Sequence, residues 1–375
     1  MLRRGPSLLT RLAFTTMASG GKGSLEAARV LEFAATGPLH SSLGQRHITP
    51  SQEDWLTHGS LLSARLSGDA NPAGCLASSN PSLARRIYHL YLPVYYFVRG
   101  CLRQRRQTDG SAIAVGLSAP QGCGKTTLVE LLTELFVSDG LSCAAVSFDD
   151  FYLTGAEQDS LAQSCPSNPL LQVRGNAGTH DLQLGTEVLR ALKQGARPVA
   201  DAQGCGQGAV PPLQIPRYDK SARGGRGDRA PRAEWPIAPV ADVVLLEGWM
   251  AGFRPLAAEE LRTRAELHAY VGLEVVNERL EAYAAWHDLM DAWVVLAVDD
   301  PAHVYEWRLQ AERAMISKGS AGMSDAQVAD FVSRYMPAYE AFLPHLYDAA
   351  RTGGVDGKPT LMVRVDASRS PVADQ

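Results

Sequence analysis

One stretch, residues 112–136, constrains the fold of this chain more than any other. It begins with the apolar run 112–117 (AIAVGL), which predicts a buried strand. A turn with the sequence SAPQGCGKT follows, and the next segment, 127–136 (TLVELLTELF), is apolar and helix-forming. Strand, tight turn and helix in this order are the context that a phosphate-binding loop needs, because the turn and the start of the helix direct backbone N–H groups towards an anion.

The turn differs from the usual pattern G-x-x-x-x-G-K-[ST] at its first position, which is Ala119. Alanine fits there if the backbone at this position needs no positive φ. Lys125 is predicted to reach the β- and γ-phosphates of ATP, and the Thr126 hydroxyl to bind Mg²⁺. The predicted ATP-binding residues are Gly122, Cys123, Gly124, Lys125, Thr126 and Thr127. The alternative is a glycine-rich turn that binds nothing.

Two further apolar runs end in carboxylates. Residues 142–148 precede Asp149 and Asp150, and the run 241–249 contains Glu247 near its end. In an open α/β sheet, ligands bind beyond the carboxyl ends of the strands, so these acids are predicted to lie beside the phosphate loop. Asp149 is a candidate base for an acceptor hydroxyl or a ligand of Mg²⁺ through water, and Glu247 a candidate support for Mg²⁺. The alternative for the two aspartates is a helix cap and turn.

Strands alternate with helices, which predicts an α/β fold of the P-loop NTPase type with a mainly parallel sheet flanked by helices. Further strands are expected at 291–298 and 360–365, and a helix at 182–194 with Asp181 as its cap. Three parts are predicted: a transit segment at 1–25, a helical N-terminal region at 26–108, and a kinase domain at 109–370.

Residues 1–25 have the composition of an organelle transit peptide, because they contain Arg3, Arg4, Arg11 and Lys22 and no acidic residue precedes Glu26. A chloroplast location is expected, with the mitochondrion or cytoplasm as alternatives.

The net charge of −4 and the lack of a long basic run argue against nucleic acid as a partner. No apolar run is long enough to span a bilayer. The six cysteines form no C-x-x-C pair, which argues against a zinc site, and a monomer is expected.

A basic loop is predicted at 201–230, with a low-complexity insertion at 201–212. Its cations lie among glycines in an otherwise acidic chain, which indicates recognition of a phosphate or carboxylate. The alternative is a solvated loop in which Asp219 and Asp228 pair with their own neighbours. Arg174, in the polar segment 174–181, is a further candidate for binding an anion.

A helix is predicted at 300–320, where Asp299 or Asp300 would cap it and Pro301 would stand in its first turn. This helix could act as a lid that brings an arginine to the transferring phosphate, and the alternative for Arg308 is a local pair with Glu312.

The segment 270–289 is predicted to be one helix with a polar face carrying Asn277 and Tyr283. After a capping box at 324–327, the stripe that ends at Tyr335 is interpreted as core.

Together these features favour phosphoryl transfer from ATP to a small hydroxyl compound, a reaction that needs charge neutralisation and positioning. One alternative is another small-molecule kinase of this fold that acts on a nucleoside, pantothenate or a sugar phosphate. The other is a nucleotide-binding regulator or ATPase without a small acceptor.

Several motifs in one order carry a resemblance to a known family. From about residue 85 to about residue 350 the chain resembles the D-glycerate 3-kinases of plants and algae. The matching segments are 118–127 (SAPQGCGKTT), 149–154 (DDFYLT), 174–181 (RGNAGTHD), 216–221 (PRYDKS), 225–229 (GRGDR), 247–250 (EGWM) and 307–312 (WRLQAE). Ala119 is in keeping with this family, whereas the insertion at 201–212 and the N-terminal part depart from it.

The resemblance implies transfer of phosphate from ATP to D-glycerate, which gives 3-phospho-D-glycerate as the closing step of photorespiration in chloroplasts. It also implies a fold related to uridine kinase and phosphoribulokinase, with ATP and Mg²⁺ as cofactors. On this basis the expected catalytic residues are Lys125, Asp149, Glu247, Arg308 and Arg313. The expected acceptor-binding residues are Asp149, Tyr152, Arg174, His180, Arg217, Tyr218 and Lys220, and the expected metal ligands are Thr126 and Glu247.

Overall fold

The computed structural model describes residues 22–68, 71, 81–108, 111–195, 212–317, 319 and 322–373. Residues 1–21 of the predicted transit segment lie outside the described residues, as does all of the predicted insertion except Pro212. The remainder of the predicted transit segment already belongs to a helix, because α2 begins at Lys22. In the part of the chain that the structure describes, no helix is both long and apolar enough to cross a bilayer.

The chain divides into two compact units, of which the first comprises residues 1–100 and 363–375. Its described N-terminal part is helical, as predicted. The elements are α2 (Lys22–Ala35), α3 (His40–Gln45), α4 (Gln52–Ser67), α6 (Pro81–Arg86) and a π-helical turn (Ile87–Tyr91), which leads into α7 (Leu92–Thr108). The aromatic residues between Tyr88 and Phe97 are buried, and the ring of Tyr96 lies 4.8 Å from that of Trp55. This run therefore serves packing.

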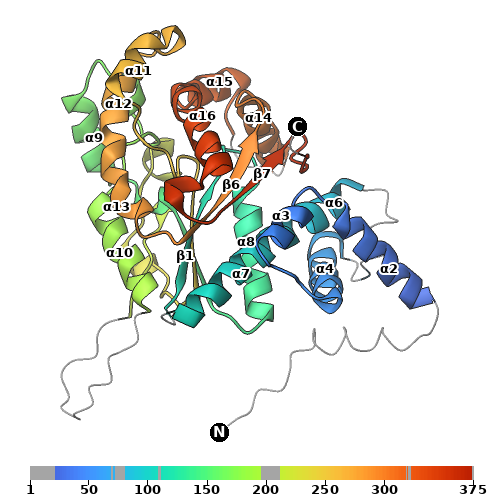
Figure 1. Cartoon of the computed structure of the whole chain (residues 1–375). Coiled ribbons are helices and arrows are strands. Elements are labelled where there is room, and N and C mark those ends of the chain that lie inside the picture. The colour runs from blue at the N-terminus through green and yellow to red at the C-terminus, as the bar shows by residue number, and fades with distance from the viewer. Residues whose placement is uncertain are drawn as a thin grey trace, which may run out of the picture. The chain divides into compact units, whose positions relative to one another are not determined.

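The second unit, residues 101–362, is built on a mainly parallel sheet (Figure 1). The strands of this sheet are β1 (Ile113–Ser118), β2 (Cys143–Ser147), β5 (Val243–Gly248), β6 (Ala292–Val298) and β7 (Thr360–Val365), in the order β2-β5-β1-β6-β7. Residues 363–365 of β7 are counted with the first unit. β5 pairs in parallel with both β1 and β2, and β1 pairs in parallel with β6. A separate two-stranded ribbon joins β3 (Tyr218–Asp219) to β4 (Asp228–Arg229). The predicted fold class is confirmed.

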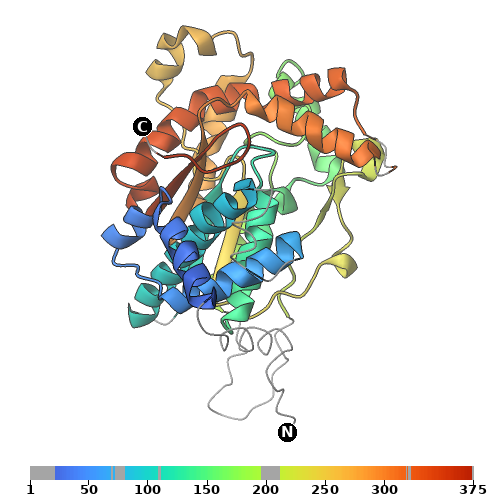
Figure 2. The ribbon, with the colours of Figure 1, turned by 90° about the vertical axis from the view of Figure 1, so that its right-hand side faces the viewer.

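Helices flank this sheet, as Figure 1 shows and the turned view in Figure 2 repeats. They are α8 (Lys125–Ser138), α9 (Gly155–Ser164), α10 (Leu182–Gln194), α11 (Ala258–Thr263), α12 (Leu273–Leu280), α13 (Ala284–His287), α14 (His303–Ser317), α15 (Asp325–Ser333) and α16 (Met336–Thr352). The side chain of Asp181 caps α10 and the predicted capping box begins α15, so both helix starts are confirmed. α8 packs on β2 and β5, and α16 packs on β6.

The prediction of one helix with a polar face at 270–289 is wrong. The segment forms α12, a 3₁₀ turn at Glu281–Tyr283, and α13. Asn277 is 7% exposed and Tyr283 is fully buried. Asn277 lies inside because its amide accepts a hydrogen bond from the Leu256 backbone N–H at 2.7 Å and donates one to the Leu256 carbonyl at 3.0 Å. A polar side chain whose donor and acceptor are both satisfied can be buried at low cost.

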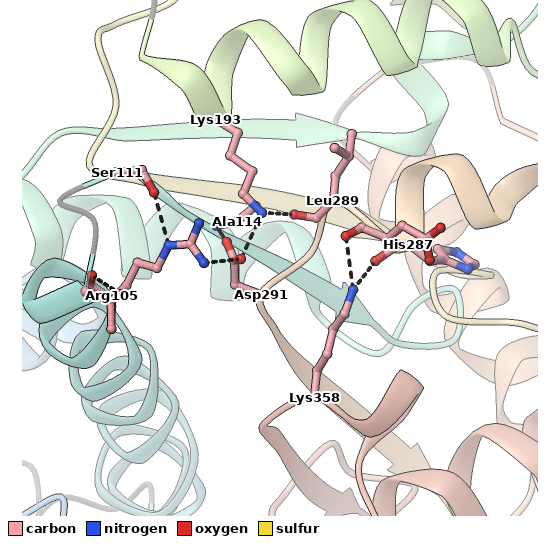
Figure 3. A network of polar contacts seen from close by, with 10 residues as sticks. Arg105, Ser111, Ala114, Lys193, His287, Leu289, Asp291 and Lys358 are labelled. Atoms are coloured by element: carbon pink, nitrogen blue, oxygen red, sulfur yellow. Dashed lines mark hydrogen bonds and ion pairs between the residues drawn. The ribbon is translucent and has the colours of Figure 1, made fainter.

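Asp291 joins several elements at the start of the parallel strands (Figure 3). Its Oδ1 accepts hydrogen bonds from Arg105 at 3.1 Å and from Lys193 at 2.8 Å, and its Oδ2 accepts from the Ala114 backbone N–H at 2.9 Å. The side chain of Asp291 is only 14% exposed. The carboxylate thus connects α7, α10 and β1 to the first residues of β6, at the opposite end of the strands from the phosphate loop.

This network gives a prediction about stability. Asp291→Asn removes the charge that two cations share, so we expect the free energy of unfolding to fall by about 2–4 kcal/mol, as for breaking a partly buried ion pair. Asp288→Asn is the matched control, because the Asp288 side chain is 74% exposed and its nearest cation, Arg254, is 3.7 Å away. We expect this control to change the free energy by no more than about 0.5 kcal/mol. Urea denaturation measures both, and equal losses would contradict the role of Asp291.

Candidate functional site

The phosphate loop lies between the end of β1 and the first residue of α8. Gly122 and Gly124 have φ angles of 80° and 100°, a backbone conformation that favours glycine. Ala119 is not among the residues with positive φ, so its methyl group is accommodated. The Lys125 ammonium donates hydrogen bonds to the carbonyls of Ala119 at 2.9 Å and Pro120 at 3.1 Å, so it lies over the loop. This is the strand, turn and helix that the sequence predicted.

The remaining predicted ATP-binding residues take different places in the loop. Thr126 and Thr127 are exposed on the first turn of α8, where backbone N–H groups point out of the helix. Cys123 is buried, with only 5% of its surface exposed. Its backbone can still face a phosphate, whereas its side chain packs inwards.

Two C-terminal helices hold the phosphate loop in place. The Gln121 backbone N–H donates a hydrogen bond to the Tyr339 hydroxyl of α16 at 2.9 Å. A Cβ atom on Gly122 would lie 2.6 Å from the Cβ of Trp307 on α14, so the helix approaches closely enough to require glycine. The loop is therefore packed on one side by α14 and α16.

The predicted acids lie at the same edge of the sheet. Glu247, near the end of β5, is paired in register with Leu117 of β1 and with Ser147 of β2. Asp149 and Asp150 stand directly after β2, in the 3₁₀ turn Phe148–Phe151. Asp150 also caps this turn through the Ser147 backbone N–H at 3.0 Å, so the structural alternative applies to Asp150 in part.

The donors at this edge fit Mg²⁺. This ion usually takes only one or two protein carboxylates together with phosphate oxygens and water. The Thr126 hydroxyl, exposed at the start of α8, and the Glu247 carboxylate on the strand beside β1 meet that requirement. Among the described residues, no group of three or more His, Cys, Asp or Glu side chains could hold a metal ion by itself. The assignment of Thr126 and Glu247 as metal ligands stays a prediction.

The two neighbouring aspartates differ in their charge partners. Asp149 pairs with Lys220, and Asp150 pairs with Arg217 at 3.0 Å. Burial by itself would raise the pKa of Asp149, but the charge and hydrogen bond of Lys220 outweigh it and hold this pKa below its usual value. Burial raises the pKa of Asp150 to about 6 despite the backbone hydrogen bond from Ser147 and the charge of Arg217. Asp149 is therefore ionised at neutral pH.

The basic loop is held by ion pairs to other elements. Arg223 and Arg226 both pair with Asp159 of α9, and Arg229 pairs with Asp181 at 2.9 Å. Asp219 and Asp228 instead accept hydrogen bonds, from Ser221 and from the Gly155 and Arg229 backbone. Both aspartates thus contact their own neighbours, as the alternative predicted, while the arginines of the loop pair with acids of other elements. Recognition of an anion by the loop stays a prediction.

An aromatic cluster connects the other predicted acceptor residues. The Tyr152 ring stacks on His180, with centroids 4.6 Å apart, and the Tyr218 ring meets Tyr152 edge-on at 5.3 Å. The His180 Nδ1 atom lies 2.6 Å from the Tyr283 hydroxyl, and burial lowers the pKa of His180 to about 4. His180 is thus neutral at physiological pH and is positioned by packing as well as by a hydrogen bond.

Arg174 closes this cluster on the side of the basic loop. Its guanidinium lies over the Tyr218 ring at 5.6 Å and donates a hydrogen bond to the Gly225 carbonyl at 3.0 Å. It also donates to the carbonyls of Arg226 and Lys220. The predicted acceptor residues Asp149, Tyr152, Arg174, His180, Tyr218 and Lys220 are thereby linked by direct contacts, and Arg217 lies next to them on Asp150.

The two arginines of α14 have different surroundings. Arg308 forms the predicted local pair with Glu312, which is 3% exposed, and its guanidinium lies 5.0 Å from the Phe331 ring centroid. Burial raises the pKa of Tyr335, and the charges of Asp149 and Arg308 act on this pKa in opposite directions. Arg313 pairs with Asp325 at 3.1 Å, and its side chain is 61% exposed. A catalytic role for either one stays a prediction.

Sequence reasoning missed three aromatic residues of the site. From the sequence, Trp307 stands out only as part of a motif, Tyr339 carries no signal of its own, and Tyr335 is predicted to be core. Tyr335 is indeed buried, with 4% of its surface exposed, but its hydroxyl faces groups of the site. No local signal separates such residues from core residues, because their helical spacing is the same.

Comparison with known proteins finds relatives that are described as kinases. The chain is 42% identical to the chloroplastic D-glycerate 3-kinase of Arabidopsis thaliana over 92% of this chain and 72% of that protein. It is 36% identical to an uncharacterized kinase of Schizosaccharomyces pombe over 72% of this chain and 94% of the relative. A solved D-glycerate 3-kinase from Cryptococcus neoformans aligns with a TM-score of 0.63 and 32% identity, over 76% of this chain and 98% of that one. No protein-family profile matches the chain.

The close approach of α14 to the phosphate loop gives a second prediction. Gly122→Ala and Gly140→Ala both place alanine at positive φ, 80° and 74°, so each should destabilise the protein by about 1–2 kcal/mol. Only the first also collides with a neighbour, because nothing lies within 4 Å of a Cβ on Gly140. We expect Gly122→Ala alone to weaken ATP binding, by about tenfold or more, which is about 1.4 kcal/mol. Calorimetric titration with ATP and Mg²⁺ measures this, and equal affinities would contradict it.

Proposed function

Because the chain belongs to the D-glycerate 3-kinase family, we propose that it transfers the γ-phosphoryl group of ATP to the 3-hydroxyl of D-glycerate. The products are ADP and 3-phospho-D-glycerate. One structural observation supports the proposal. Asp149, ionised and paired with Lys220, lies at the edge of the sheet where β1 leads into the phosphate loop. A base and a cation for a carboxylate-bearing acceptor are thus close to the residues that bind ATP.

In this proposal, the phosphate loop binds ATP through its backbone N–H groups and Lys125, which neutralises charge on the β- and γ-phosphates. Thr126 and Glu247 hold Mg²⁺, which withdraws charge from the phosphate oxygens when bound. Phosphoryl transfer needs little covalent chemistry from the protein, so positioning and charge stabilisation account for most of the catalysis. Arg308 is proposed to stabilise charge in the transition state, and Arg313 is a second candidate.

The acceptor is proposed to bind between the aromatic cluster and the basic loop. Its carboxylate is bound by cations from the set Arg174, Arg217 and Lys220, with Tyr152, His180 and Tyr218 forming the wall. The Lys220 side chain is 58% exposed and the Arg217 side chain 41% exposed. Exposed ion pairs are weak, so these cations can exchange a protein carboxylate for a ligand carboxylate at little cost. Asp149 then accepts the proton of the 3-hydroxyl as it attacks the γ-phosphorus.

We propose a chloroplast location and a role in photorespiration as well. The support is the chloroplastic relative from Arabidopsis thaliana together with the basic, acid-free composition of residues 1–25. A fluorescent fusion of the full chain, compared with one lacking residues 1–21, tests the location. Mitochondrial or cytoplasmic fluorescence of the full chain would contradict it without affecting the proposed reaction.

The reaction is tested by measuring ADP release from ATP and Mg²⁺ with D-glycerate, L-glycerate, glycerol or no acceptor. We expect release that depends on D-glycerate, and a product identified by phosphorus NMR as the 3-phosphate. Formation of the 2-phosphate would contradict the position of transfer. Release without an acceptor would favour an ATPase or regulator. Activity only with uridine, pantothenate or a sugar phosphate would favour a different small-molecule kinase.

The role of Asp149 gives a further prediction. Asp149→Asn removes the base, so kcat should fall by about 10²–10⁴-fold while the KM for ATP stays nearly constant. Asp150→Asn is the matched control, because it makes the same change one residue away, on the carboxylate that pairs with Arg217. We expect the control to lose less than about tenfold in kcat, which would show that Asp150 does not supply the base. A larger loss for Asp150→Asn than for Asp149→Asn would transfer the role of base to Asp150.

A further inference from the structure

The Tyr283 hydroxyl holds two parts of the segment 174–181. It accepts a hydrogen bond from the Gly178 backbone N–H at 3.0 Å, and its oxygen lies 2.6 Å from Nδ1 of His180. Tyr283 is fully buried in the 3₁₀ turn between α12 and α13. A backbone N–H can only donate, so the Tyr283 oxygen accepts from Gly178 and its own proton is available for His180. One hydroxyl therefore fixes both the backbone and a side chain of this segment.

The His180 ring is enclosed by the aromatic residues on either side of Asp149 in the sequence. It stacks on Tyr152, with centroids 4.6 Å apart, and meets the Phe148 ring edge-on at 5.9 Å. Asp149 lies between these two residues, and its carbonyl accepts a hydrogen bond from the Tyr152 N–H at 3.4 Å. The backbones of His180 and Tyr152 also form an isolated antiparallel bridge. These contacts place the imidazole beside the turn that carries the proposed base.

The second ring nitrogen of His180 has no hydrogen-bond partner among the residues that the structure describes. This atom, Nε2, is closed off from solvent, and the whole residue is 5% exposed. Because the two nitrogens lie on different sides of the ring, Nε2 is directed away from Tyr283. A buried polar atom without a partner is costly and calls for an explanation, and a ligand that supplies the partner is one.

Hydrogen-bond satisfaction decides which nitrogen of His180 carries the proton. Burial lowers the pKa of His180 to about 4, despite the negative charge of Asp149, so the ring is neutral and carries one proton at neutral pH. With that proton on Nδ1, the Tyr283 proton and the Nε2 lone pair would both lack partners. With the proton on Nε2, the Tyr283 hydroxyl donates to Nδ1, and only the Nε2–H lacks a partner. The second arrangement leaves fewer buried groups unsatisfied and is therefore favoured.

We propose that Tyr283 is a positioning residue that holds His180 as the Nε2–H tautomer, and that this N–H donates a hydrogen bond to the 2-hydroxyl oxygen of the acceptor. This inference rests on the proposed function. There, cations bind the acceptor carboxylate and Asp149 accepts the proton of the 3-hydroxyl, so the 2-hydroxyl is the acceptor group that still needs a partner. A neutral N–H suits an uncharged oxygen, and the buried Nε2–H beside Asp149 is such a donor.

The acceptor must displace the cover of Nε2, because this atom is closed off from solvent in the free protein. Tyr218 of β3 meets the Tyr152 ring edge-on at 5.3 Å, and β3 leads directly into Lys220, which pairs with Asp149. The proposed function already includes the exchange of this pair for the acceptor carboxylate. The same exchange releases the ribbon that packs on the stack of Tyr152 and His180.

NMR of the full chain labelled with nitrogen-15 histidine tests the tautomer without any substrate. Long-range proton–nitrogen spectra show which ring nitrogen is protonated, and His180→Asn identifies the signals of His180. We expect a protonated Nε2 and an unprotonated Nδ1 at neutral pH, and a proton on Nδ1 would overturn the proposal. The Nδ1 signal should move in Tyr283→Phe and stay in place in Tyr347→Phe. Tyr347 is the matched control, because it is also a buried tyrosine whose hydroxyl accepts from a backbone N–H, that of Val298 at 3.2 Å.

The contact with the 2-hydroxyl is tested by comparing kcat/KM for D-glycerate with kcat/KM for 3-hydroxypropionate, which lacks only that group. We expect the unmodified chain to prefer D-glycerate by about 100-fold or more, because a site that binds a hydroxyl rejects the analogue without it. His180→Asn should reduce this preference by about tenfold or more, whereas His180→Gln, whose longer amide can reach the place of Nε2, should keep more of it. Tyr283→Phe should reduce it by about 3–10-fold, as for the loss of one neutral hydrogen bond, and Tyr347→Phe by less than about twofold.

A double-mutant cycle shows whether Tyr283 acts through His180. In the His180→Asn background, Tyr283→Phe should cause no further loss of preference. Losses that multiply would overturn the positioning role of Tyr283. A preference in His180→Asn within about twofold of that of the unmodified chain would overturn the contact with the 2-hydroxyl. If the unmodified chain shows no turnover that depends on D-glycerate, the proposed function fails instead, and the nitrogen spectra still decide the tautomer.

Discussion

The parallel pairing of β5 with both β1 and β2 is the constraint on which the site depends. In register, Glu247 lies opposite Leu117 on one side and Ser147 on the other. Because parallel strands all end at the same edge, this pairing brings the phosphate loop, the two aspartates and Glu247 together without any further adjustment. The network of Asp291 lies at the other end of the strands, where the cost of holding buried charge does not affect the chemistry.

The charges of the site are arranged in two classes. Glu312 is 3% exposed and holds both Arg308 and the Met323 backbone N–H, so this arrangement is part of the framework. The pairs that involve Lys220 and Arg217 have exposed cations, and exposed pairs contribute little to stability. Arg217 and Lys220 are the cations that we propose for binding the acceptor carboxylate, and their present pairs cost little to replace.

The parts of the fold that could be predicted from the sequence are those fixed by short-range patterns. The five strands of the main sheet were placed within two residues of their observed ends, and the phosphate loop, the Asp181 cap and the capping box of α15 follow from local residue types. The burial of Asn277 could not be predicted, because it depends on the backbone of Leu256, which is distant in sequence. α16 was not predicted as a helix, and it contains Pro344, a residue that normally argues against one.

Contacts made by α16 explain why the site could be predicted only in part from the sequence. Its buried tyrosines look like core residues, and most of the surface of each one does pack in the core. Yet Tyr339 accepts a hydrogen bond from the phosphate loop, and Tyr347 accepts one from the Val298 backbone N–H at the end of β6, at 3.2 Å. A buried tyrosine combines a large apolar ring with one polar atom that needs a partner. Where that partner is the backbone of the phosphate loop, as for Tyr339, the residue that packs in the core also holds the loop, so a change in this packing also changes the position of the loop.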